Sequence, residues 1–85
     1  MTNPIIMQMQ INLQKSKKDY QEYSIKAQRL LNEIITIIAS PYFDTPDELR
    51  AEEIEQAGDE LLTVKHKLID LQKQINKYKR DLGND

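Results

Sequence analysis

The chain of 85 residues contains no cysteine, a single histidine and only two glycines. Without cysteine it can form neither disulfides nor thiolate metal sites, and it has no thiol nucleophile. Two isolated glycines cannot make a glycine-rich phosphate loop, and His66 has no second histidine with which to build a helical metal site. We therefore expect no catalytic residues, no metal, no cofactor and no small-molecule substrate.

Long hydrophobic runs are also lacking. The most apolar run, residues 30–39, is ten residues long and includes Asn32 and Glu33, whereas a membrane-spanning helix needs about 20 apolar residues. The first seven residues have no basic residue ahead of their apolar stretch and do not resemble a secretory signal. These features predict a small soluble cytoplasmic protein, and the net charge of −2 argues against coating nucleic acid or anionic lipid by bulk charge.

What the chain does contain is two apolar stripes with a seven-residue repeat, which we call the core stripes. The first consists of Ile6, Met9, Leu13, Ser16, Tyr20, Tyr23, Ala27, Leu30, Ile34 and Ile37, and the second of Ile54, Ala57, Leu61, Val64, Leu68, Leu71, Ile75, Tyr78 and Leu82. Alternating steps of three and four residues place each stripe on one side of an α-helix. The sequence therefore predicts an all-α protein.

Capping residues set the expected limits of the two helices. Asn3 is a suitable N-cap before Pro4, and Pro41 must end the first helix. The segment 45–48, Thr-Pro-Asp-Glu, has the pattern of a capping box, and Gly83 supplies a stop. These signals predict one domain, residues 1–85, with a helix over 4–40, a turn over 41–45 and a helix over 46–82.

The beginning of the first helix has an alternative interpretation. Met7, Met9, Ile11 and Leu13 alternate with polar residues, and a period of two is typical of a strand. We favour the helix because the seven-residue repeat continues through residues 6–13, and because the second helix needs a partner along its whole length.

Two helices joined by a short link bury their stripes most simply as an antiparallel, coiled-coil-like hairpin. Two registers, one heptad apart, are acceptable. The first places Leu30 opposite Ile54 and brings Lys26 near Glu60 and Asp19 near Lys67. The second places Ile37 opposite Ile54, Leu30 opposite Leu61, and Leu31 over Gly58. We favour the first register slightly because of its charge pairs.

Further apolar residues lie beside the core stripes, and we call them the side stripe. Its members are Leu31, Ile35, Ile38, Leu62 and Ile69. One antiparallel neighbour cannot cover so wide an apolar arc, and a domain this small lacks burial. We therefore expect the side stripe to be an interface that completes a four-helix bundle by homodimerisation. The alternatives are that the Tyr42–Phe43 loop folds over the stripe, or that a different helical protein binds there.

Gly58 lies inside the predicted second helix, which we expect to be continuous, and it costs about 0.8–1.0 kcal/mol relative to alanine there. Its missing side chain either allows Leu31 or a partner helix to approach closely, or is a tolerated weak point. The sequence favours neither interpretation.

Charge is divided between the two ends of the predicted hairpin. The loop end, residues 24–64, has three basic and nine acidic residues, whereas the open end, residues 1–23 and 65–85, has nine basic and five acidic residues. Basic residues of the open end suggest a less favoured function as a nucleic-acid accessory factor, through Lys15, Lys17, Lys18, Lys73, Lys77 and Arg80. Because the whole chain is acidic, we expect nucleic acid to be an improbable partner.

Overall fold

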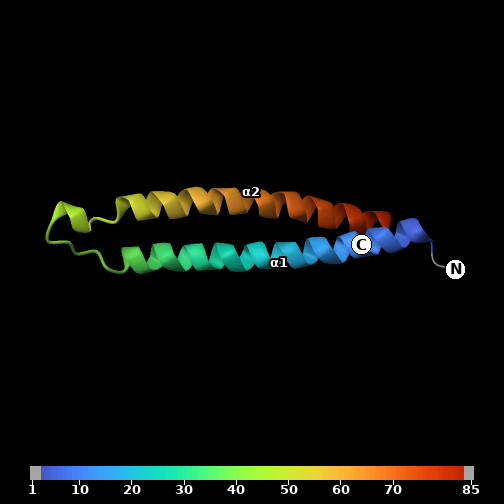
Figure 1. Ribbon diagram of the computed structural model, residues 1–85, viewed down its shortest axis with the longest axis horizontal. Coiled ribbons are helices and arrows are strands. Elements are labelled where there is room, and N and C mark those ends of the chain that lie inside the picture. Colours follow the sequence, from blue (N-terminus) through green and yellow to red (C-terminus); the bar gives the residue numbers. More distant parts are fainter. Residues whose placement is uncertain (1–2, 84–85) are drawn as a thin grey trace.

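The computed structural model describes residues 3–83 and contains two long helices that lie side by side (Figure 1). Helix α1 spans Pro4–Ile38 and helix α2 spans Ala51–Asp81, with a short 3₁₀ helix, η1, at Pro46–Glu48 in the link between them. The molecule measures 70 × 18 × 15 Å, and the start of α1 and the end of α2 lie at the end opposite the link (Figure 1). The predicted all-helical hairpin is confirmed.

Helix α1 begins where the capping residues predict. The Asn3 side-chain oxygen accepts a hydrogen bond of 2.9 Å from the Ile5 amide, and Pro4 occupies the first helical position. Leu13 is buried while Met7 and Ile11 are exposed, which is the periodicity of a helix face and not of a strand. The strand alternative for residues 4–12 is therefore wrong.

The link between the helices is longer than predicted, because α1 ends at Ile38, before residue 40, and α2 begins at Ala51, after residue 46. Helix α1 stops at Ile38, since Pro41 disfavours the α conformation at the residue before it. The capping box does not form: the Thr45 side chain makes no capping bond, and the Glu48 carboxylate instead accepts a 2.8 Å bond from the Asp44 amide. Pro46–Glu48 closes a separate 3₁₀ turn, so the prediction that the second helix starts at residue 46 is wrong.

Helix α2 starts beside an ion pair between Arg50 and Glu53. The Arg50 Nε donates a 2.8 Å hydrogen bond to the Glu53 carboxylate, and a second guanidinium nitrogen contacts the same oxygen. This hydrogen bond is the main cause that lowers the pKa of Glu53. Desolvation opposes it, and the positive charge of Arg50 lowers the pKa further. Glu53 also lies in the first turn of the helix, where a negative charge is favourable.

We expect the Glu53 carboxyl to titrate below its ordinary value of 4.5 and to return toward that value in Arg50→Ala. Since the folded pKa is lowered, the pair stabilises the start of α2 above the unfolded pKa, and that contribution is lost as the pH falls through the folded pKa. Site-resolved NMR titration of Glu53 measures this. An unchanged midpoint in Arg50→Ala would contradict the assignment.

The core is a single seam between the helices. Leu30 and Val64 are the most completely buried side chains, with 1% and 2% of their surface exposed, and they pack with Ala57. Tyr23, Ala27, Ile34, Leu61 and Leu68 are partly buried against this cluster. Leu13, Leu71 and Ile75 continue the seam toward the open end. Every one of these residues belongs to a core stripe.

The register of the hairpin differs from the one that charge pairing favours. The Ser16 hydroxyl donates to the Gln74 side-chain oxygen at 3.4 Å, and the Lys67 ammonium lies 5.9 Å from the centre of the Tyr23 ring. In both pairs the residue numbers add up to 90, which is within one residue of the register that places Leu30 opposite Leu61. The favoured register, with Leu30 opposite Ile54, is therefore wrong.

Burial explains why the alternative register is the more stable one. The favoured register would leave Ile34 and Ile37 without a partner on α2, whereas the observed one half-buries both. Burying one aliphatic side chain fully is worth about 1.5–3 kcal/mol, while an exposed ion pair contributes about 0.2–1 kcal/mol. Among residues 3–83 the expected pairs Lys26–Glu60 and Asp19–Lys67 do not form, and Arg50–Glu53 is the only ion pair.

Candidate protein-interaction surface

The two helices form an elongated pair with two long faces, which differ in composition. We letter the heptads so that Ile6 and Ile54 occupy position a, and Met9 and Ala57 occupy position d. The e and b positions of both helices then lie on one face and the g and c positions on the other. The surface hollows agree with this division: one combines a residues with Lys65, Ile69 and Gln72 at e and b, while another combines d residues with g residues such as Asp19 and Lys67.

We call the e and b side the charge-poor face. It comprises Met7, Gln10, Gln14, Lys17, Gln21, Ser24, Gln28, Leu31, Ile35 and Ile38 of α1 and Ala51, Glu55, Gly58, Leu62, Lys65, Ile69, Gln72, Asn76 and Lys79 of α2. Only four of these nineteen residues are charged. On the opposite face, twelve of the nineteen g and c residues are charged. Depletion of charge is the compositional mark of the centre of protein interfaces.

All five side-stripe residues lie on the charge-poor face, and all are exposed: Leu31, Ile35, Ile38, Leu62 and Ile69. The alternative in which the loop folds back over them is not what the structure has, because Tyr42 is 93% exposed and Phe43 about half exposed. The aromatic residues of the link lie around Ile37 and Ile38, at the end of the hairpin, and leave the other side-stripe residues open. The side stripe is therefore exposed in the hairpin.

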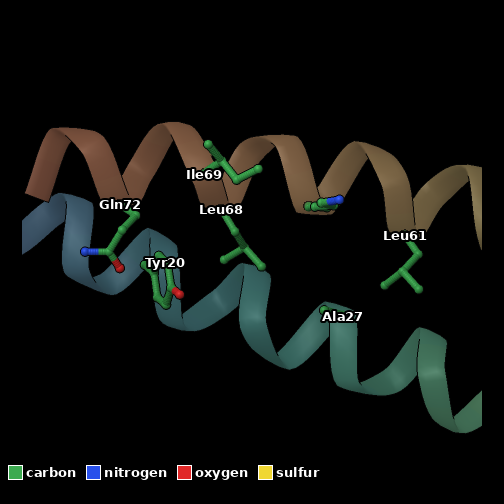
Figure 2. Close-up of a pocket in the computed structure, with 7 residues that line it drawn as sticks. Tyr20, Ala27, Leu61, Leu68, Ile69 and Gln72 are labelled. Carbon is green, nitrogen blue, oxygen red and sulfur yellow. The ribbon is translucent and has the colours of Figure 1, made fainter.

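A hollow of about 300 Å³ opens onto the charge-poor face between the helices. Figure 2 shows Leu61 and Leu68 extending from α2 toward α1 on either side of Ala27, whose short side chain leaves the space between them unfilled. Tyr20 lies below Leu68 at one end of the hollow (Figure 2). The hollow is the size of a site for one or two aliphatic side chains, and it is apolar on its floor.

Gly58 lies on the same face and is not approached by any side chain of its own hairpin. A Cβ atom added at Gly58 would have no neighbour within 4 Å among the described residues. The interpretation in which Leu31 approaches Gly58 closely is therefore wrong. The space above the glycine is open on the charge-poor face.

The basic residues suggested for nucleic-acid contact do not form a single groove. Lys15 and Lys77 lie at c positions, Lys17 lies at an e position, and Lys18, Lys73 and Arg80 point outward at f positions. The six cations thus surround the open end on several sides. Tyr78, which could stack on a base, is half-buried at a d position of the core stripe.

Residues 3–83 contain no group of three or more His, Cys, Asp or Glu side chains that could hold a metal ion. His66 is exposed on the side of α2 away from the core. Neither helix has an apolar segment long enough to cross a membrane.

Sequence reasoning identified the apolar side stripe but missed two features of the surface around it. The uncharged polar residues at e and b positions, mainly glutamine, could have been identified from the heptad pattern and show that the face extends beyond its apolar members. The hollow beside Ala27 could not be predicted from the sequence, because its existence depends on the register, which decides which residues of α2 lie opposite Ala27. Comparison with protein-family models, curated protein sequences and solved structures gave no match.

Proposed function

We propose that this protein is a non-enzymatic interaction module that self-associates through its charge-poor face into a four-helix bundle. The observation that carries the proposal is the contrast between the two long faces, with four charges on one and twelve on the other. In a hairpin that existed alone in solution, both long faces would be exposed to water, and nothing would favour so few charges on one of them. A face that is buried against another helical pair needs that composition, because an unpaired buried charge is costly.

The exposed area supports the same proposal. The hairpin exposes 6908 Å², whereas a compact protein of 10.0 kDa is expected to expose about 5,200 Å². The excess of about 1,700 Å² is larger than the approximately 800 Å² that each partner contributes to a standard stable interface. Its radius of gyration of 19.2 Å likewise exceeds the roughly 12 Å of a compact chain of this length. Packing two hairpins face to face would bury much of the excess exposed area.

The mechanism is burial of the side stripe. Exposed aliphatic side chains that become covered contribute about 25 cal/mol for each Å² of apolar surface removed from water. The glutamine and serine side chains around them suit the rim of an interface, since they can form hydrogen bonds to water or to the partner. Burying them does not remove a charge from water. A second copy always supplies a surface of matching composition, which favours self-association over an adaptor role with a different helical protein.

Light scattering coupled to size-exclusion chromatography tests the proposal. We expect a molar mass twice the 10.0 kDa of the chain, together with the circular dichroism of a largely helical protein. A chain with the mass of one copy at every concentration would contradict self-association. If that monomer were also poorly helical, a different helical partner would become the better explanation of the charge-poor face.

A further inference from the structure

We propose, building on the self-association above, that the second copy packs antiparallel to the first, about a two-fold axis that crosses α2 at residue 60. Such an axis lays α2 against the partner's α2 and α1 against the partner's α1. In such a bundle, residues of α2 that are equally distant from residue 60 face each other across the interface. These facing residues are complementary in size and in charge.

Three pairs of residues on the charge-poor face of α2 are equally distant from residue 60, and each pair is complementary. Leu62 falls opposite the partner's Gly58, where the missing side chain and the empty surroundings leave room for it. Ile69 falls opposite the partner's Ala51, again a large residue against a small one. Lys65 falls opposite the partner's Glu55, and the two-fold axis repeats this pair with the roles of the two copies exchanged. Two of the four charges on each charge-poor face therefore gain a partner of opposite sign.

Helix α1 gives the same axis from different residues. Facing residues in the hairpin add up to 90 in the two contacts between side chains and to 91 where Leu30 stands opposite Leu61, so residue 60 of α2 is level with residues 30–31 of α1. Leu31, an exposed member of the side stripe, therefore meets the partner's Leu31 on the axis. Ile38, seven residues further along, falls level with the partner's Ser24, which places it at the hollow beside the partner's Ala27. The exposed isoleucine thus has a cavity of suitable size and polarity.

A parallel arrangement fits the same face less well. It would lay α2 against the partner's α1, with Glu55 against the partner's Ile35 and Ile69 against the partner's Gln21. It would also align the two acidic loop ends, each with nine acidic and three basic residues, and the two basic open ends. The antiparallel arrangement instead moves each loop end toward the basic half of the other copy, which is electrostatically favourable.

Charge exchange at one pair tests the register. Lys65→Glu and Glu55→Lys should each weaken the dimer about tenfold, because each converts two attractive pairs into two repulsive ones. The double variant Glu55→Lys/Lys65→Glu restores the attraction with reversed sign and should return the dissociation constant to within about threefold of the parent. Asp70→Lys, on the charge-rich face of the same helix, is the matched control and should leave it unchanged. Sedimentation equilibrium measures all four.

A distance measurement tests the orientation. Since the chain has no cysteine, Thr45→Cys provides a single labelling site at the tip for a nitroxide. With a rise of 1.5 Å per residue, the antiparallel dimer separates the two tips by more than about 35 Å, whereas neighbouring parallel hairpins would hold them within about 20 Å. Pulsed electron spin resonance distinguishes these values.

The outcomes separate the two proposals. A dimer with adjacent tips, or one in which the double variant is no tighter than the single ones, overturns the antiparallel geometry and leaves self-association standing. A protein that is monomeric at every concentration overturns both. Distant tips together with rescue in the double variant support the axis at residue 60.

Discussion

Replacing Leu30 by alanine is expected to lower the free energy of unfolding by about 2–5 kcal/mol. Leu30 is 1% exposed and lies at the centre of the cluster with Ala57 and Val64. Truncation removes its buried methyl groups and leaves a cavity that two rigid helices cannot close. Since so small a domain has little stability in reserve, most of the Leu30→Ala protein should be unfolded at 25 °C. Urea denaturation followed by circular dichroism measures the loss.

Ile25→Ala is the matched control for this substitution. Ile25 lies on the same helix, five residues from Leu30, but it points away from α2 and is 64% exposed. Surface substitutions of this kind usually change stability by no more than about 0.5 kcal/mol. If Leu30→Ala lost no more stability than Ile25→Ala, the seam centred on Leu30 and Val64 would not be the core of the hairpin.

Replacing Ile35 by lysine is expected to produce monomers, with a dissociation constant at least 100-fold above that of the parent. Ile35 is 59% exposed in the hairpin and lies at the middle of the side stripe. In the proposed bundle the substitution buries two unpaired ammonium groups, one from each copy, at several kcal/mol each. The hairpin itself should be little affected, because the side chain does not belong to the core seam. Light scattering and thermal melting report the two effects separately.

Ile25→Lys controls for the charge and for the loss of an isoleucine. Ile25 and Ile35 have nearly the same exposure, 64% and 59%, but Ile25 points directly away from the core and lies outside the charge-poor face. Its lysine variant should keep the mass and the melting curve of the parent. An Ile35→Lys protein that also kept them would rule out the charge-poor face as the interface.

The sequence contained enough information for the hairpin because its signals repeat. Nineteen core-stripe residues agree on one helical side each, and local capping by Asn3 and Gly83 agrees with them: the Asn3 side chain caps α1, and Gly83 follows α2 with a φ of 74° that favours glycine. An error at any one residue would not have changed the result. The surplus of apolar residues at 31, 35 and 38 was visible for the same reason.

The register and the start of α2 depended on differences that the sequence does not resolve. Registers one heptad apart both keep the two core stripes facing each other and differ in whether Ile34 and Ile37 gain a partner on α2. Weak surface charge pairs favoured the register in which they do not. At residues 45–48 the capping pattern was correct in composition, but the Glu48 carboxylate reached the Asp44 amide and the chain left the helix at Leu49. Whether residues 45–49 join the second helix depends on the tertiary arrangement of the whole link.

The single seam of buried side chains has a consequence for the life of the protein in a cell. Each helix is covered on one side only by its own chain, so in a self-associating hairpin the second copy acts as the stabilising ligand, and stability grows as RT ln(1 + [L]/Kd) with the concentration of the chain itself. Freshly made or scarce copies would open more often and be degraded faster than abundant ones. The rate of turnover would thereby fall as the protein accumulates, which makes its half-life a measure of its own abundance.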